Sequence, residues 1–354
     1  MAIELSSITF TDQDDIVPAF GVEQIVNTGV ANTLAGNDII NGESGNSIPD
    51  GGVLTPSRGI LNTGTLNTDA GNDILTGIAN DQIFVGFAFG IDNQGGTINT
   101  GDGNDTITGI VQTNRRAAGI HYTEGTIDTG DGNDAIIGIN PRGGGVVSAR
   151  NGIINTGTGN DTITGSTSSG PGILFGNGGN ADTGDGDDVI TGITGGGDGL
   201  HNYLFNSGDG NDTITGISPS GSGIRNQGPM NTGNGDDIIT GIGLIGINNL
   251  SIINTGNGQD SIIADGGFDG SGNVFLGNGK DYIKGFGSGN FNGGNGKDTL
   301  ELTSGNYIVG ISGTTVNFIK GSTIMKTSDF EILIAGNTTY GISSLNNGQT
   351  IFIA

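Results

Sequence analysis

Short runs of aliphatic and β-branched residues alternate with glycine-rich polar loops along most of the chain. Nine loops between Gly101 and Leu300 read G-x-G-x-D-x-(Ile/Leu), and two earlier copies lack the leading glycine. Runs such as the Thr-Ile-Thr of residues 106–108 and 213–215 end at Gly, and this pattern predicts short strands. Because one loop recurs at solenoid-like spacing, each repeat is expected to be one lap of a coil.

The motif aspartates set the length of each lap. Successive aspartates are 35, 32, 29, 27, 27, 24, 25, 23, 21 and 17 residues apart, so the laps shorten toward the C-terminal end. The variation falls in one segment, after Asp-x-Ile-Thr-Gly-Ile, which leaves the loop edge of the coil constant. We therefore expect an all-β fold, a tapered right-handed parallel β-solenoid with strands roughly 4.8 Å apart and aliphatic ladders inside. The motif aspartates are Asp38, Asp73, Asp105, Asp134, Asp161, Asp188, Asp212, Asp237, Asp260, Asp281 and Asp298.

Three regions follow from this pattern. Residues 32–300 hold the repeats. Residues 1–31 lack the motif and contain Phe10 and Phe20, and we expect them to cap the wide end. Residues 301–354 change to longer alternating runs, such as Tyr307-Ile-Val-Gly-Ile-Ser, which predicts a β-rich cap over the narrow end.

Composition narrows the function. The chain has 74 Gly, 7 Pro, no Trp and 32% hydrophobic residues, which is too few for a conventional globular core but enough for a solenoid. Its net charge of −25 comes from 30 Asp and 6 Glu against 11 Lys and Arg, with no basic run, so nucleic acid and anionic membranes are disfavoured as partners. The absence of Cys excludes disulfides and thiolate sites. No stretch approaches a membrane span, and the start of the chain lacks the pattern of a cleaved signal peptide.

The aspartates are candidate ligands for calcium. Ca²⁺ takes six to eight oxygen ligands, and glycine-rich turns can aim backbone carbonyls at one point. One loop supplies too few carboxylates, but two stacked laps would place Asp105 beside Asp134 and complete a site. Folding coupled to calcium follows, because the same carboxylates would repel one another without metal. The alternative is that Asn and Asp form hydrogen-bonded ladders with no metal. The candidate ligands are Asp73, Asp105, Asp134, Asp161, Asp188, Asp212, Asp237, Asp260, Asp281 and Asp298.

The loops resemble the RTX (repeats-in-toxin, haemolysin-type) calcium-binding repeat, G-G-x-G-x-D-x-U-x with U a large apolar residue, over about three quarters of the chain. The C-terminal segment from Asp298 is similar to the closing region of cyanobacterial proteins of this type. The resemblance implies calcium held between consecutive loops, and export through a type I channel by an uncleaved C-terminal signal. The chain departs from the family in the first motif Gly, which is complete only at Gly293-Gly294, and in having one loop per lap. We therefore expect one file of ions, with the loops of Asp38 and Asp73 the weakest because Leu34 and Asp69 replace a motif glycine.

Both histidines fall in one column of the expected stack. The column reads Leu61, Asp92, His121, Val147, Leu174, His201, Arg225 and Asn248. Around the pair Asp92 and His121 lie Arg115, Arg116, Tyr122 and Glu124, and the longest insert adds Phe84, Phe87 and Phe89. This composition is typical of a sugar or small-molecule pocket. The alternative is a solvated sheet face with the Phe cluster under its own loop. The candidate catalytic residues are His121, Arg116, Tyr122, Glu124, Asp92 and His201.

Three functions remain open from sequence. The first is an exported calcium-binding structural or surface protein, extracellular or on the cell surface. The second is an enzyme on a β-solenoid, acting on polysaccharide or on a small biosynthetic intermediate and cytoplasmic in the latter case, with its site near residues 79–125. The third is an ice-binding or adhesive face built from Thr-x-Thr pairs, which Ile137 interrupts. Calcium and either polysaccharide or a small molecule are the expected partners.

Overall fold

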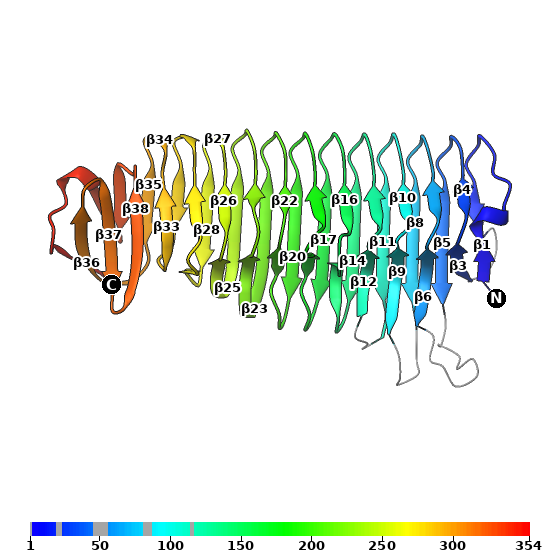
Figure 1. The fold of residues 1–354 in the computed structure, drawn as a ribbon, viewed down its shortest axis with the longest axis horizontal. Coiled ribbons are helices and arrows are strands. Elements are labelled where there is room, and N and C mark those ends of the chain that lie inside the picture. The colour runs from blue at the N-terminus through cyan, green and yellow to red at the C-terminus, as the bar shows by residue number, and fades with distance from the viewer. Residues whose placement is uncertain (1, 19–22, 45–55, 81–86, 114–116) are drawn as a thin grey trace.

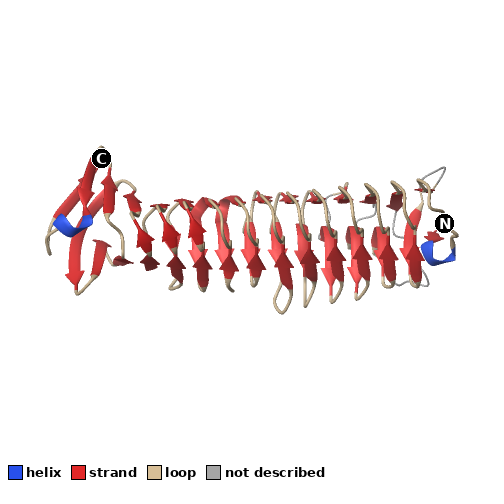
Figure 2. Ribbon diagram, turned by 90° about the horizontal axis from the view of Figure 1, so that it is seen from above, coloured by secondary structure: helices blue, strands red, loops and turns tan. Residues whose placement is uncertain are grey.

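The structure is a computed structural model that describes all residues except 1, 19–22, 45–55, 81–86 and 114–116. The chain winds into a long rod of stacked laps, with the glycine-rich loops along one edge and the variable segments along the other (Figure 1). Figure 2 shows the same stack from above, with strands of successive laps side by side. The expected parallel β-solenoid is confirmed, and the described residues contain no helix long and apolar enough to cross a membrane.

Each full lap contributes three strands, and equivalent strands of successive laps pair in parallel and in register. The first strands, which follow the loops, are β2 (Ile16–Val17), β5 (Ile39–Ser44), β8 (Ile74–Ala79), β11 (Thr106–Val111), β14 (Ala135–Asn140), β17 (Thr162–Thr167), β20 (Val189–Thr194), β23 (Thr213–Asn226), β25 (Ile238–Asn249), β28 (Ser261–Asp265), β32 (Tyr282–Lys284), β35 (Thr299–Leu302) and β39 (Ile332–Ala335). Strands β23 and β25 are long enough to continue into the second column.

The second strands are β1 (Ala2–Glu4), β3 (Gln24–Asn27), β6 (Ser57–Asn62), β9 (Ala88–Gln94), β12 (Ala117–Thr123), β15 (Gly144–Ser148), β18 (Ile173–Phe175), β21 (Leu200–Asn202) and β29 (Phe268–Asp269). The third strands are β4 (Val30–Asn32), β7 (Thr65–Asn67), β10 (Thr97–Asn99), β13 (Thr126–Asp128), β16 (Ile153–Asn155), β19 (Asn180–Asp182), β22 (Phe205–Asn206), β24 (Met230–Asn231), β26 (Ile252–Asn254), β30 (Asn273–Phe275), β33 (Gly289–Asn292) and β38 (Thr323–Ser328). Within the loops, β27 (Asn257–Gly258), β31 (Asn278–Gly279) and β34 (Asn295–Gly296) form a third small sheet.

The two ends of the chain differ in how they join the stack. Strands β1 to β4 of residues 2–32 already pair with the laps that follow, so the coil begins within the segment expected as an N-terminal cap. A 3-10 turn, η1 (Leu5–Ser7), lies among them. At the other end β36 (Gly305–Ser312), β37 (Thr315–Lys320), β40 (Thr338–Gly341) and β41 (Thr350–Ile353) pair in antiparallel fashion, with η2 (Ile342–Ser344) between the last two. These strands replace the parallel repeat over the final laps.

Aliphatic ladders fill the interior between the three strand columns. In the lap that starts at Asp105, each strand contributes a fully buried isoleucine to the main core: Ile107, Ile120 and Ile127. Their equivalents in neighbouring laps lie directly above and below them, because the pairing is in register. A small number of inward side chains per lap therefore builds one continuous core, as the low hydrophobic content requires.

Two columns of glycine bring the first and second strands into direct backbone contact. A Cβ added to Gly165 of β17 would lie 2.0 Å from the carbonyl oxygen of Gly172, just before β18. The equivalent distance from Gly109 to the carbonyl of Gly119 is 2.2 Å. This close backbone contact, which we call the pinch, separates the main hydrophobic core from a smaller set of buried side chains nearer the variable edge. It also explains why the motif reads Thr-Gly-Ile in the first strand.

We expect Gly165→Ala to destabilise the fold by about 3 kcal/mol, because the new methyl group meets backbone that cannot move without separating the laps. Gly196→Ala is the matched control, since a Cβ at Gly196 finds its nearest atom 3.6 Å away. Denaturant unfolding of both variants checks this. Equal stability of the two would show that the strands can part at the pinch without cost.

Candidate functional site: a buried column of carboxylates

The motif aspartates form one column inside the loop edge. All eleven side chains are at most 1% exposed. In ten of them, from Asp73 to Asp298, Oδ1 accepts the backbone N–H of the motif aspartate one lap earlier, at 2.7 to 2.9 Å. For example, the N–H of Asp161 donates to Asp188, whose own N–H donates to Asp212. The sequence placed these residues correctly in one file, and the structure adds that the file is buried.

Sequence reasoning missed two members of this column. The N–H of Asp15 donates to Oδ1 of Asp38 at 2.8 Å, and the N–H of Asp298 donates to Oε2 of Glu331 at 2.8 Å. Strand pairing places both acids at the motif position, because β2 is in register with β5 and β39 with β35. Neither has the motif glycines. The signal that was available is an acid followed by two aliphatic residues, as in Asp15-Ile16-Val17.

The second oxygen of every motif aspartate has no hydrogen-bond partner among the residues that the structure describes. Oδ2 is buried and unpaired in all eleven residues, from Asp38 to Asp298. Burial raises the pKa of each carboxyl, and the adjacent Thr hydroxyl, where there is one, and the neighbouring backbone N–H oppose the shift only in part. The pKa rises to about 6 in Asp73 and Asp260, to about 7 in Asp134, Asp188, Asp237 and Asp281, and to about 8 in Asp212.

Outside the column, a second ladder of side chains covers the loop. Asn133 donates its backbone N–H to Oδ1 of Asn104 at 2.6 Å, and Asn160 donates to Asn133 in the same way. This is the ladder arrangement that the sequence left open as the metal-free alternative. The ladder and the column together give hydrogen-bond partners to the loop N–H groups and to Oδ1 of each motif aspartate. They give no partner to Oδ2.

A buried carboxylate oxygen without a protein partner is stable when it is protonated, hydrogen-bonded to a buried water or bound to a cation. The donors near it suit a hard cation. They include the carboxylates of neighbouring laps and the hydroxyls of a Thr column, in which Thr183 lies beside Asp188. Among the described residues no three His, Cys, Asp or Glu side chains gather around one point, so backbone and hydroxyl oxygens would have to complete the coordination. Calcium fits this donor set, because it accepts many oxygen ligands in variable geometry.

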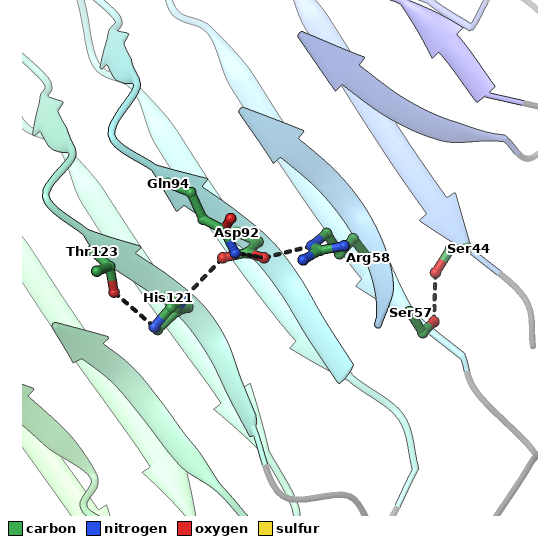
Figure 3. Close-up of polar contacts among 7 residues, drawn as sticks. All are labelled: Ser44, Ser57, Arg58, Asp92, Gln94, His121 and Thr123. Atoms are coloured by element: carbon green, nitrogen blue, oxygen red, sulfur yellow. Dashed lines mark hydrogen bonds and ion pairs between the residues drawn. The ribbon is translucent and has the colours of Figure 1, made fainter. Parts of the chain in front are cut away.

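The second candidate site lies on the outer face of the second strands. Asp92 of β9 is fully buried and accepts hydrogen bonds from the Nε of Arg58 on β6 and from the side-chain amide of Gln94. It also faces His121 of β12, with 2.8 Å between Oδ1 and Nδ1, and Nε2 of His121 lies 2.9 Å from Oγ1 of Thr123 (Figure 3). The sequence brought Asp92 and His121 together correctly. It gave no signal for Arg58, whose position depends on strand register. Thr123 was also missed, although strand alternation places it two residues beyond His121 on the same face of β12.

The other candidate catalytic residues lie elsewhere. Tyr122 points into the core, fully buried, on the opposite face of β12 from His121. Glu124 is exposed in the turn after β12, and Arg116 falls outside the described residues, as does Phe84. The ring of Phe89 stacks on His121 at 4.9 Å. His201 lies three laps away on β21, stacked on Tyr203 and within 2.9 Å of the Gln227 amide.

Comparison with known proteins gives no match, either to the models of protein families or to the curated protein sequences. The resemblance to RTX repeats therefore rests on the loop motif.

Proposed function

We propose that this chain is a calcium-binding β-solenoid that folds when its column of loop aspartates is loaded with calcium. The observation that carries the proposal is the set of eleven buried Oδ2 atoms without a partner. Leaving so many buried acceptors unpaired would cost roughly 1–3 kcal/mol each, more than a protein of this size can lose. Ions between consecutive loops would satisfy these oxygens and offset the net charge of −25.

Titration of the metal-free chain with calcium and with magnesium in a calorimeter tests this proposal. We expect calcium to bind and magnesium to bind far more weakly, because Mg²⁺ requires a near-ideal octahedral site and gives up its waters reluctantly. Heat from neither ion, at millimolar concentration and pH 8, would contradict it.

Calcium-dependent folding also supports export of the chain. Where free calcium is scarce the metal-free chain would stay unfolded and able to thread through a channel, and it would fold once outside. The measurement is an immunoblot of cell and medium fractions from the native host. Finding the protein confined to the cells would contradict export.

The hydrogen bonds of His121 favour a second candidate function, acid–base chemistry at Thr123. In the tautomer whose Nδ1–H donates to the buried Asp92, Nε2 can accept the proton of the Thr123 hydroxyl. An acid, an imidazole and a hydroxyl in this order are the arrangement that activates a nucleophile in hydrolases. This arrangement supports an enzyme of the kind that the sequence left open.

Labelling with a fluorophosphonate tests this function, because attack by the Thr123 oxygen on phosphorus expels fluoride and leaves a stable adduct. We expect mass spectrometry to find the adduct on Thr123 and to show at least tenfold slower labelling in His121→Gln, since a general base contributes that much or more. Thr164→Val, on another face, is the control. Absence of any adduct on Thr123 would mean that the hydrogen bonds among Asp92, His121 and Thr123 have only a structural role.

A further inference from the structure

One outer face of the rod carries no charge over seven successive laps. The outward side chains of the first strands β8, β11, β14, β17, β20, β23 and β25 form three straight columns, because these strands pair in register. We call this the first-strand face. Its members are Ile74, Thr76, Ile78, Thr106, Thr108, Ile110, Ala135, Ile137, Ile139, Thr162, Thr164, Ser166, Val189, Thr191, Ile193, Thr213, Thr215, Ile217, Ile238, Thr240 and Ile242.

Several large aliphatic side chains on this face are open to solvent. The most exposed reach 40% for Ile74, 41% for Val189 and 42% for Ile238. Outward threonines are ordinary in strands, but a contiguous uncharged surface with exposed aliphatic side chains is unusual on a chain of net charge −25. Charge returns where the face ends, at Glu43 on β5 and at Asp265 on β28.

The extent of the face is close to what a specific interface requires. Seven laps at roughly 4.8 Å and five residues at roughly 3.3 Å give a footprint of about 500 Å². Two such footprints bury about 1,000 Å² in total, which is the lower limit for a specific and reversible protein interface. A second copy of the chain has the same repeat along its axis, so columns of Ile and Thr on two copies remain in step over the whole length. All other partners would have to match that spacing by coincidence.

We propose that two copies of this chain pack through their first-strand faces to form a reversible dimer. The faces are self-complementary, as a two-fold interface requires. Their lack of charge makes this the surface on which two strongly acidic copies repel each other least. The dimer should therefore tighten as salt screens the remaining repulsion.

Sedimentation of the full chain in calcium buffer tests the dimer. We expect a concentration-dependent species of twice 35.4 kDa that is favoured at higher salt. Thr191→Lys and Thr215→Lys place a charge at the centre of the face and should raise the dissociation constant at least tenfold, since they bury an unpaired charge. Ile153→Lys is the matched control, because Ile153 is 41% exposed on the third-strand face and should leave the dimer unchanged.

Three results would overturn the dimer. The first is a monomer at every concentration. The second is a dimer that Ile153→Lys weakens as much as either face variant does. The third is a monomer that lowers the freezing point of the solution below the melting point of ice (thermal hysteresis) and loses this activity in Thr191→Lys. That result would identify the face as an ice-binding surface. Circular dichroism of each variant checks that it is folded. Because there are two variants on the face, the test remains valid if one of them fails to fold.

Discussion

Removing calcium at pH 8 should unfold the solenoid. At this pH the buried carboxyls of the loop column are mostly ionised, even with a pKa of about 6 in Asp73 or about 8 in Asp212. Without a cation they would form a file of unpaired charges one lap apart, which the surrounding hydrogen bonds cannot offset. Far-UV circular dichroism with excess chelator should therefore lose its β signal, and added calcium should restore it.

Acid should rescue the metal-free chain. The folded pKa values of about 6 to 8 lie above the ordinary value of 3.8, so the metal-free fold binds more protons than the unfolded chain. Its stability is then fully present below about pH 4 and is lost as the pH rises through 6 to 8. The calcium-loaded chain should respond in the opposite sense near neutrality, because protons compete with the ion. Melting temperatures at pH 5 and pH 8, each with calcium and with chelator, measure this. Four similar melting temperatures would contradict cation binding by the column of motif aspartates.

Asp188→Asn should change stability in opposite directions with and without calcium. The amide keeps an oxygen that can accept the N–H of Asp161, and it removes the charge at Oδ2. In chelator at pH 5, where the metal-free chain stays folded, the variant should be more stable than the parent by about 1–3 kcal/mol, because folding of the parent has to protonate a carboxyl that is ionised in the unfolded chain. In calcium it should be less stable by a similar amount, because a charged ligand of the ion has become a neutral one.

Asp185→Asn is the matched control for Asp188→Asn. Asp185 is an exposed residue of the same loop, so the same loss of charge should alter stability by less than about 0.5 kcal/mol in either buffer. Denaturant unfolding of the three proteins with calcium and with chelator gives the comparison. A gain of stability for Asp188→Asn in both buffers would identify the column as a metal-free, protonated ladder.

The fold follows from the sequence because its pattern is periodic. The two-residue step from Asp105 to Ile107 recurs in every motif copy, and that phase determines which side of each first strand is buried. The graded intervals also predict laps of decreasing length, and the last ones lose the second strand, as between β32 and β33. The pinch at Gly165 and Gly172 could not be foreseen in the same way, since a glycine in a strand pattern has several meanings.

The candidate sites were predictable only where the residue type itself carries the signal. The motif aspartates were found by repetition, whereas Asp15 and Glu331 were missed because they share the position but not the glycines. Tyr122 shows the limit of reasoning from proximity along the chain, because strand alternation turns it away from His121 and into the core. The contact of Arg58 with Asp92 depends on the register between β6 and β9, 34 residues apart, which composition does not encode.

The central claim is that the unpaired oxygens of the loop column hold calcium. The most direct measurement is the calcium content of the folded protein, purified at pH 8 in calcium and desalted, by elemental analysis. We expect about ten calcium ions per chain, one for each pair of adjacent motif aspartates. A folded protein that contains no calcium under these conditions would contradict it.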